Sequence, residues 1–377
     1  MKVAHVIDKI GWGGADKLLL TFTEVASRRK IDTLVIGLMP PSHKSEIPNA
    51  LRAFGAEVFE FSYRKLYDPR VIPTLMFLLK KKRVDVVHTH LSHSNILGSM
   101  AAKVVNIPTV TTLHNTRETQ TGRLGLRIRL EHYCLSNLTS RVIAVGANVA
   151  SVYRPILRSD LLEIIPNSVR LGREITSQKR DAIRIELTGD TDRTLVLAVG
   201  RLKFHKGYHD LLTAFAKVHE AHPRAFLVIV GFGDLMDSLK EYSSALGISE
   251  HVRFLGSRND VPQLLAAADV YVNSSHWEGL SIAMLEAMAA GLPVVATSVG
   301  DAAILLATGG GLLAEPKNPN DLAYALENLL SDPEKMRAMG KIARECVEKN
   351  YNSDVWLDKL VTCYALAQKK DRLENKL

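Results

Sequence analysis

The first half of the chain alternates short runs of Val, Ile and Leu with longer stretches whose apolar residues recur at helical spacing. Six runs are predicted as strands: Val3–Ile7, Thr33–Gly37, Glu57–Phe61, Asp85–His88, Thr109–Leu113 and Arg141–Val145. Helices are predicted between them, at Asp16–Arg28, Val71–Lys82 and Ser94–Val105. The strand runs are apolar without alternation, which is typical of a parallel sheet covered by helices on both faces.

A polar stretch, Arg170–Arg193, interrupts this pattern and is predicted as a linker followed by a short helix. The alternation then restarts, with strands predicted at Thr194–Val199, Phe226–Val230, Val252–Leu255, Val270–Val272 and Pro293–Ala296 and a last helix at Val355–Gln368. Two series of β/α units predict the α/β class, with two doubly wound, Rossmann-like domains facing a central cleft. We expect domains at 1–170 and 171–354, and we expect the C-terminal segment, about 355–377, to pack back on the first domain.

Length and composition agree with two ordinary globular domains, because 377 residues with 46% hydrophobic and 23% charged side chains exceed one comfortable core. The N-terminal residues lack the features of a signal peptide, and no stretch of about 18 apolar residues is present. The three cysteines, Cys134, Cys346 and Cys363, show no metal-ligand spacing and are expected to be free thiols. We therefore expect a cytoplasmic protein.

Charge is distributed unevenly along the chain. Residues 1–170 carry 24 Lys and Arg against 13 Asp and Glu, a balance of +11, whereas the remainder carries 24 against 27, a balance of −3. A basic first half indicates contact with something anionic, and nucleic acid, an anionic membrane surface and a phosphorylated substrate all qualify.

A glycine turn, Gly11-Trp-Gly-Gly-Ala-Asp16, directly follows the first predicted strand and opens a helix. Glycines allow close approach of a ligand to the backbone, and a helix N-terminus offers N–H groups to an anion. The turn is not the GxGxxG fingerprint of dinucleotide-binding proteins, which disfavours a nicotinamide dehydrogenase. An ordinary tight strand-to-helix turn explains the segment equally well.

A basic loop, Val199-Gly-Arg-Leu-Lys-Phe-His-Lys-Gly207, follows the first strand of the second half. Arg201 offers a planar fork of donors and Lys206 a point charge, a complementary pair for a diphosphate. The alternative is a solvated basic loop.

The third candidate is the segment from Glu278 to Glu286. Glu278 is predicted in a loop, and Ser281 at the start of a helix whose first N–H groups, those of Leu280, Ser281 and Ile282, face a phosphate. Glu286 falls inside an apolar helix, where a carboxylate needs a partner such as a ribose hydroxyl. The spacing alone is weak, because chance supplies about one such pair, and a solvent-facing Glu286 is the alternative.

Taken together, these segments resemble the group 1 (family 4) glycosyltransferases of the glycogen-synthase-like superfamily, which have the GT-B fold. The matching segments run in the family's order along nearly the whole chain: Gly13-Gly14, His114, Ile165-Pro-Asn-Ser168, Gly200-Arg201 with Lys206-Gly207, Gly231-Phe-Gly-Asp, Phe254-Leu-Gly256, Glu278-Gly279 with Glu286-Ala287, and Gly291-Leu-Pro-Val. No single segment is decisive, but the set is highly specific.

The resemblance implies a role for each matching residue in the second half. Arg201 and Lys206 would bind the donor diphosphate and stabilise the departing nucleoside diphosphate. Glu286 would bind the ribose hydroxyls. Glu278, with Gly279 beside it, would lie next to the donor sugar and is the strongest candidate for the chemistry.

In the first half, the resemblance implies that Gly13 and Gly14 contact the donor phosphates and that His114 positions the donor sugar or the acceptor. Members of the family retain anomeric configuration and lack the metal-binding motif of the other common transferase fold. We therefore expect no metal and no cofactor, the nucleotide-sugar being a co-substrate.

Two other features of the first half bear on partners. His88-Thr-His90 places two imidazoles on one face of a strand without a third metal ligand nearby in the sequence, so a polar lining for the acceptor is favoured over a metal site. Arginines alternate with leucines and isoleucines along Arg117–His132, as in segments that lie at a membrane interface. The basic segments lack aromatic platforms, which disfavours nucleic acid.

The sequence thus predicts a retaining, metal-independent hexosyltransferase that moves a sugar from a nucleotide diphosphate-sugar, a UDP-sugar in preference to GDP-mannose, to a glycan or lipid-linked acceptor. Polysaccharide biosynthesis at the cell surface is the expected setting, with the protein cytoplasmic and peripheral on the inner face of the membrane. The alternatives are a nucleotide-sugar 2-epimerase on the same fold and a non-catalytic sugar-nucleotide-binding protein.

Overall fold

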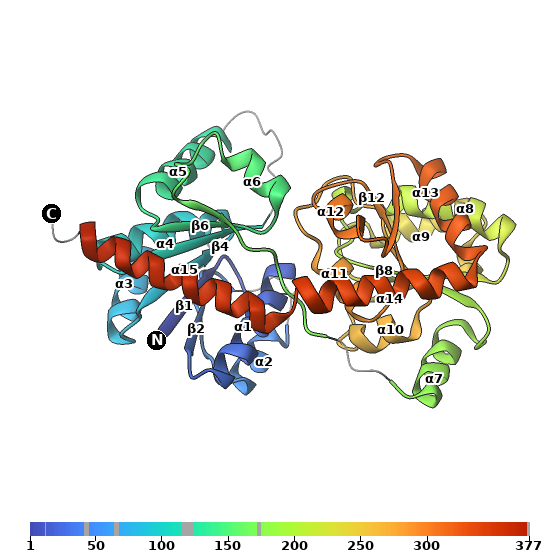
Figure 1. The fold of residues 1–377 in the computed structure, drawn as a ribbon, viewed down its shortest axis with the longest axis horizontal. Helices are drawn as coiled ribbons and strands as arrows, with labels where there is room; N and C mark the ends of the chain where they lie inside the picture. The colour runs from blue at the N-terminus through green and yellow to red at the C-terminus, as the bar shows by residue number, and fades with distance from the viewer. Residues whose placement is uncertain (12, 41–44, 64–67, 115–123, 172–174, 375–377) are drawn as a thin grey trace. The chain divides into compact units, whose positions relative to one another are not determined.

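The computed structural model describes residues 1–11, 13–40, 45–63, 68–114, 124–171 and 175–374 (Figure 1). The chain forms two compact units. The first comprises Met1–Ser168 and Ser353–Leu377, and the second comprises Val169–Asn352.

The first unit is built on a parallel sheet of seven strands in the order β3-β2-β1-β4-β5-β6-β7. The strands are β1 (Lys2–Ile7), β2 (Asp32–Gly37), β3 (Glu57–Glu60), β4 (Val86–His90), β5 (Thr109–Leu113), β6 (Arg141–Ala144) and β7 (Leu162–Ile164). The sequence predicted the first six to within two residues at each end. It did not predict β7, which is three residues long and only partly buried.

Helices cover this sheet: α1 (Gly14–Arg28), α2 (Ile47–Ala53), α3 (Val71–Lys81), α4 (Ser92–Val104), α5 (Leu124–Asn137), α6 (Ala147–Tyr153) and α15 (Ser353–Glu374). The last of these returns from the C-terminal end of the chain and lies along the first unit (Figure 1). Leu357, Leu360 and Tyr364 on α15 are buried in one cluster with Val3 and Phe22. Burying such side chains stabilises the contact by about 1.5–3 kcal/mol each, so α15 is part of this unit's core.

The second unit repeats the architecture with six parallel strands in the order β10-β9-β8-β11-β12-β13. They are β8 (Thr194–Val199), β9 (Ala225–Val230), β10 (Val252–Gly256), β11 (Val270–Asn273), β12 (Val294–Thr297) and β13 (Gly311–Ala314), and β13 was not predicted. The helices are α7 (Ser177–Thr188), α8 (Tyr208–Ala221), α9 (Met236–Ala245), α10 (Val261–Ala267), α11 (Ile282–Ala289), α12 (Ala302–Leu306), α13 (Pro319–Leu330) and α14 (Pro333–Asn350). Two parallel, helix-covered sheets confirm the predicted fold class.

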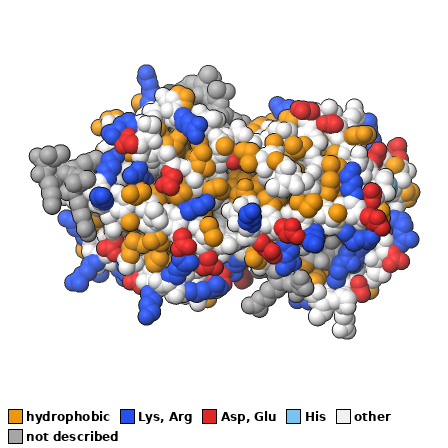
Figure 2. Space-filling view, viewed as in Figure 1, with side chains coloured by type: hydrophobic (Ala, Val, Ile, Leu, Met, Phe, Trp, Pro, Cys, Tyr) orange, Lys and Arg blue, Asp and Glu red, His pale blue; other side chains and the backbone are white. Residues whose placement is uncertain are grey.

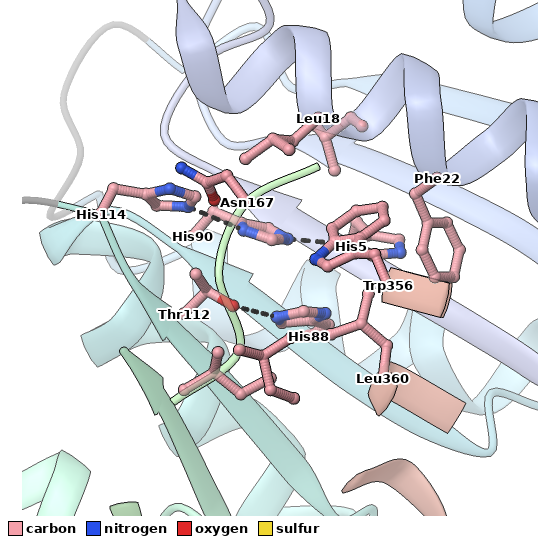
Figure 3. Close-up of a pocket in the computed structure, with 13 residues that line it drawn as sticks. His5, Leu18, Phe22, His88, His90, Thr112, His114, Asn167, Trp356 and Leu360 are labelled. Atoms are coloured by element: carbon pink, nitrogen blue, oxygen red, sulfur yellow. Dashed lines mark hydrogen bonds between the residues drawn. The ribbon is translucent and has the colours of Figure 1, made fainter. Parts of the chain in front are cut away.

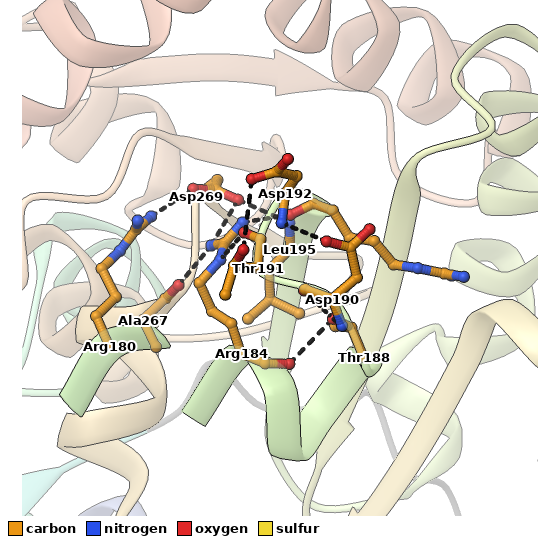
Figure 4. Close-up of polar contacts among 10 residues, drawn as sticks. Arg180, Arg184, Thr188, Asp190, Thr191, Asp192, Leu195, Ala267 and Asp269 are labelled. Carbon is orange, nitrogen blue, oxygen red and sulfur yellow. Dashed lines mark hydrogen bonds and ion pairs between the residues drawn. The ribbon is translucent and has the colours of Figure 1, made fainter. Parts of the chain in front are cut away.

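The short helix predicted within the polar stretch is α7, and one buried arginine fixes it to the sheet (Figure 4). The Arg184 side chain is 5% exposed and donates to the Asp269 carboxylate at 3.0 Å. It also donates to the carbonyl oxygens of Thr191 and Ala267, each at 2.8 Å. Asp269 accepts in addition from the Leu195 N–H at 2.8 Å, where β8 begins. A charge buried in this way is tolerated because its donors are occupied.

No helix of the described part of the chain combines the length and the hydropathy needed to cross a bilayer.

Replacing Arg184 should destabilise the second unit strongly, because Arg184→Met leaves a carboxylate and buried carbonyls without their donor. We expect a loss of about 3–5 kcal/mol in the free energy of unfolding, measured by urea denaturation. Arg180 pairs with the same carboxylate at 2.8 Å but is 39% exposed, so Arg180→Met is a matched control expected to cost less than about 1 kcal/mol. Equal losses in the two variants would contradict this account.

Candidate functional site

Four loops meet at the carboxyl edge of the second sheet, because all of its strands are parallel. These loops follow β8, β9, β11 and β12. Glycines with positive φ allow the backbones of the loops to come into contact. A β-carbon on Gly231 (φ +146°) would collide with the carbonyl of Gly200, and one on Gly207 (φ +64°) with the carbonyl of Ser274. The loop after β12 closes the group in the same way, since a β-carbon on Gly300 (φ +56°) would collide with the carbonyl of Gly279. Glycine is required at each of these positions.

The two predicted diphosphate ligands lie in the loop after β8 but in different surroundings. Arg201 is exposed, and no described residue pairs with its guanidinium. Lys206 ends a short 3₁₀ turn, Phe204–Lys206, and its side chain is 18% exposed. Its ammonium forms an ion pair with the carboxylate of Glu278, 72 positions further along the chain. The fold thus joins two of the residues that the sequence singled out separately.

Glu278 is held from a second side as well. The hydroxyl of Ser275, which is fully buried, donates to the same carboxylate oxygen at 2.9 Å. The Glu278 side chain is 14% exposed, so its charge is largely shielded from water by its partners. The net stability gained from such a shielded ion pair is small, because the cost of desolvating both charges offsets their attraction, but the pair fixes where both charges lie.

Helix α11 begins in this loop, as the sequence predicted. Ser281 is its N-cap and accepts from the Met284 N–H at 3.4 Å, while Asn273 donates to the Ser281 hydroxyl at 3.3 Å. Leu280, just before the cap, is buried. The N–H groups of the first turn and the positive end of the helix dipole therefore face the loop that carries Glu278.

Glu286 lies in the middle of α11 and is partly buried. Burial raises the pKa of Tyr271 well above its usual range, and the charges of Tyr208, Glu278 and Glu286 raise it further. Both carboxylates thus lie within electrostatic reach of one buried phenol. The structure brings Lys206, Glu278, Ser281 and Glu286 to one edge of the sheet.

In the first unit, the glycine turn after β1 is occupied by the chain itself. The N–H groups of Gly11 and Gly13 donate to the Asp16 carboxylate, at 2.9 Å and 2.7 Å. Gly13 is the N-cap of α1, Gly14 is its first residue, and Asp16 is buried. A carboxylate of the protein therefore already sits where the sequence placed an anion. The roles of Gly13 and Gly14 in holding donor phosphates stay predictions.

His114 follows β5 and is half-buried, and it ends a row of imidazoles (Figure 3). Its Nε2 lies 3.1 Å from Nδ1 of His90, and Nε2 of His90 lies 2.9 Å from Nδ1 of His5. Sequence reasoning missed His5 because the strand that carries it lies far from His90 in the chain. Parallel pairing of β1 with β4, which puts His5 opposite His88 and Ile7 opposite His90, is the feature that joins them.

The ring nitrogens of His5, His88 and His90 lie within 4.8 Å of one another, close enough to be considered as metal ligands. Their orientation does not favour this. The His5 and His90 rings are stacked, with centroids 5.2 Å apart and 17° between the planes, and the His88 ring is tilted by 33° against His90. Both nitrogens of His88 are also used, at 2.7 Å each, by the hydroxyls of Tyr364 and Thr112. A hydrogen-bonded cluster explains the geometry better than a metal site.

All four imidazoles are neutral at pH 7. Burial lowers the pKa of His5 to about 3 and that of His114 to about 4. Burial lowers the pKa values of His88 and His90 well below the usual range too, and the neighbouring histidines add to this effect. The space among these side chains is about that of one water molecule, and apolar residues such as Phe22, Trp356 and Leu360 close it. The cluster is therefore a buried site that disfavours charge.

These pKa values predict loss of stability in acid. An unfolded histidine binds a proton below about pH 6.5, whereas folded His5 does not until about pH 3. The free energy of unfolding should therefore fall as the pH drops from 6.5 toward 3 and be unaffected by this group above pH 7. His5→Phe should reduce the loss between pH 7 and pH 5 by about 2 kcal/mol, measured by urea denaturation at each pH. An unchanged pH dependence in this variant would contradict the burial of a neutral His5.

Comparison with known proteins agrees with the architecture of both units. The model of "Glycosyltransferase Family 4" matches residues 12–173, and the model of "Glycosyl transferases group 1" matches residues 179–346. Among curated relatives, the UDP-Gal:alpha-D-GlcNAc-diphosphoundecaprenol alpha-1,3-galactosyltransferase of Escherichia coli is 28% identical over 97% of this chain and 96% of its own length. A GDP-mannose-dependent phosphatidylinositol monomannoside mannosyltransferase of Corynebacterium glutamicum is 34% identical, over 52% of this chain and 54% of its own.

Among solved structures, HepE of Anabaena in complex with UDP and glucose superimposes with a TM-score of 0.86 at 22% identity, over 97% of this chain and 99% of HepE. This likeness shows the fold. The two family models together span most of the chain, and the chain belongs to the group 1 (family 4) glycosyltransferases, with the GT-B fold.

Proposed function

We propose that this glycosyltransferase moves a hexosyl unit from a nucleotide diphosphate-sugar to a glycan or lipid-linked acceptor, with retention of configuration and without a metal. The observation that carries the proposal is the Lys206–Glu278 ion pair, placed at the N-terminus of α11 and in the same group of loops as Arg201. A cation, an exposed guanidinium and a helix N-terminus together form a receptor for a diphosphate.

In this proposal the donor diphosphate takes over Lys206 from Glu278. Arg201, exposed and without a partner among the described residues, supplies a fork of donors to the same group. As the bond between sugar and diphosphate breaks, negative charge grows on the leaving group, and both cations stabilise it more strongly than in the ground state. The released Glu278 carboxylate then accepts from hydroxyls of the sugar, and Glu286 accepts from those of the ribose.

A UDP-sugar is the donor that we favour. The Escherichia coli relative that matches nearly the whole chain uses UDP-Gal, and HepE binds UDP. The relative that depends on GDP-mannose matches about half of the chain. The acceptor of the first relative is a diphosphoundecaprenol lipid, which supports a lipid-linked acceptor and a place in cell-surface polysaccharide biosynthesis.

Lys206→Ala should weaken binding of the nucleoside diphosphate itself. A hydrogen bond to a charged group is worth about 1.5–3 kcal/mol, so we expect UDP affinity, measured by calorimetry, to fall by about tenfold or more. Lys203 lies in the same loop but pairs with Asp234 and is 41% exposed. Lys203→Ala is therefore the control and should change UDP affinity by less than about twofold. Unchanged UDP affinity in the Lys206 variant would refute the site.

A thermal-shift panel of UDP-, GDP- and ADP-sugars on the parent protein identifies the base of the donor.

Glu278→Ala should separate binding from chemistry. The variant frees Lys206 from its internal partner, so UDP affinity should stay the same or rise. Release of UDP from the sugar that the panel selects should fall by about a hundredfold. Conversion of the nucleotide-sugar without release of UDP would support the 2-epimerase alternative. Binding without either reaction would support a non-catalytic protein.

Contact with an anionic membrane is part of the proposal, and α5 is the element that supports it. Leu126, Leu130 and Tyr133 are 76%, 37% and 57% exposed, at a spacing that puts them on one side of the helix, and Arg129 beside them is also exposed. An apolar stripe flanked by arginine fits the interface of an anionic bilayer. The earlier part of the basic segment, 117–123, lies outside the described residues. On the face shown in Figure 2, Lys and Arg side chains are dispersed among Asp and Glu, so net charge does not single out a membrane-binding surface there. The exposed apolar stripe of α5 is therefore stronger support for membrane contact than net charge is.

Flotation with liposomes tests this membrane contact. The protein should float with vesicles that contain anionic lipid at low salt, and Leu126→Gln should reduce the bound fraction severalfold. Phe77 on α3 is 64% exposed and outside this stripe, so Phe77→Gln is the matched control and should bind like the parent protein. Equal flotation with neutral and anionic vesicles would contradict the proposal.

A further inference from the structure

Three imidazoles of the first unit form a continuous hydrogen-bonded row from the inside of the sheet to His114. His5 lies on β1 and is 1% exposed, and His90 ends β4 and is 5% exposed. The two contacts, 2.9 Å from His5 to His90 and 3.1 Å from His90 to His114, both join ring nitrogens (Figure 3). A nitrogen–nitrogen hydrogen bond needs one N–H and one lone pair, and a neutral imidazole has one of each.

The row therefore has two self-consistent arrangements of its protons. In one, all three rings carry the proton on Nδ1, so each donates toward His114, whose own Nδ1–H remains free to donate. In the other, all three carry it on Nε2, and His114 presents a bare Nδ1 that accepts. A proton cannot be placed differently on one ring without losing a hydrogen bond or setting two N–H groups against each other.

The buried end of the row decides between these arrangements. Nε2 of His5 is buried and has no hydrogen-bond partner in the described part of the chain. The ring packs at 4.3 Å, centroid to centroid, against Phe22, an apolar neighbour. Burying an N–H without an acceptor is rarer in proteins than leaving an acceptor unsatisfied, so the bare Nε2 is favoured. This selects protons on Nδ1 throughout the row.

We propose that His90 and His5 are positioning residues that fix His114 as the Nδ1–H tautomer, so that His114 donates a hydrogen bond to an oxygen of the sugar or acceptor. The inference rests on the proposed function and on the role that the family resemblance implies for His114, which is to position the donor sugar or the acceptor. Nδ1 of His114 has no partner among the described residues, and its ring is half-buried, so this donor is available to a ligand. Low pKa values along the row keep an extra proton from disturbing it.

His88 provides an internal comparison. It lies two residues before His90 on the same strand and is 2% exposed, so it is buried and, contrary to the prediction from the sequence, does not line a surface open to an acceptor. Its two nitrogens bond to Tyr364 and Thr112 and not to the row. Loss of His88 should therefore disturb packing without changing the tautomer of His114.

Nitrogen-15 NMR of the histidine-labelled protein tests the proposal directly, because protonated and bare ring nitrogens have different chemical shifts. We expect a protonated Nδ1 and a bare Nε2 for His114 in the ligand-free protein. In His90→Phe, His114 should become a mixture of tautomers. His90→Gln, whose side chain has an NH2 donor group and a carbonyl acceptor at similar spacing, should restore the single form. A protonated Nε2 on His114 in the parent protein overturns the proposal.

Kinetics of UDP release from UDP-galactose give the second readout. His90→Phe should lower kcat by about tenfold, the equivalent of one hydrogen bond, while UDP affinity changes less than about twofold. His90→Gln should recover most of the rate, and His88→Phe should lower the melting temperature but keep kcat. Equal loss of kcat in the His88 and His90 variants would show a merely structural cluster and overturn the proposal. If His114→Ala leaves UDP release unchanged, the proposed role of His114 fails, whatever tautomer NMR assigns.

Discussion

The contact between the backbones of Gly231 and Gly200 is the constraint on which the rest of the candidate site depends. These residues directly follow the neighbouring parallel strands β8 and β9, and the chain leaves no room for a β-carbon between them. Similar contacts join Gly207 to Ser274 and Gly300 to Gly279. Because four loops touch through backbone alone, the side chains that they carry are placed by the rigid sheet and not by flexible loop packing. Lys206 reaches Glu278 for this reason.

In both units, the groups that the sequence predicted to bind an anion are paired with a carboxylate of the chain. In the second unit Glu278 pairs with Lys206, and in the first unit Asp16 accepts from the N–H groups of Gly11 and Gly13. Each of these shielded donors therefore has an acceptor, and a buried donor without an acceptor would cost free energy. In the proposed function, a phosphate that binds at Lys206 displaces Glu278. The Glu278 carboxylate then becomes available to sugar hydroxyls, so this exchange would link donor binding to the position of Glu278.

The histidine row follows a different principle. Burial keeps its imidazoles neutral. The row is therefore described by which of two proton arrangements it adopts and not by a charge. Such a row transmits the environment of the buried His5 to the half-exposed His114 without any movement of the backbone. A metal at the same place would have to displace a hydrogen bond of His88, since both of its ring nitrogens are already used.

The sequence by itself determined the fold class and most elements, because apolar runs of strand length and helical periodicity are local properties. Thr109–Leu113 and Thr194–Val199 were predicted with the bounds that the structure shows, whereas β7 and β13, short and partly exposed, left too weak a pattern. The motifs also identified Lys206 and Glu278 as candidates. Only the tertiary structure decided that they form an ion pair, that Asp16 fills the glycine turn, and that His5 joins His90. These contacts span 72 and 85 positions or turn on where a side chain points, and neither distance in space nor direction is encoded in local periodicity.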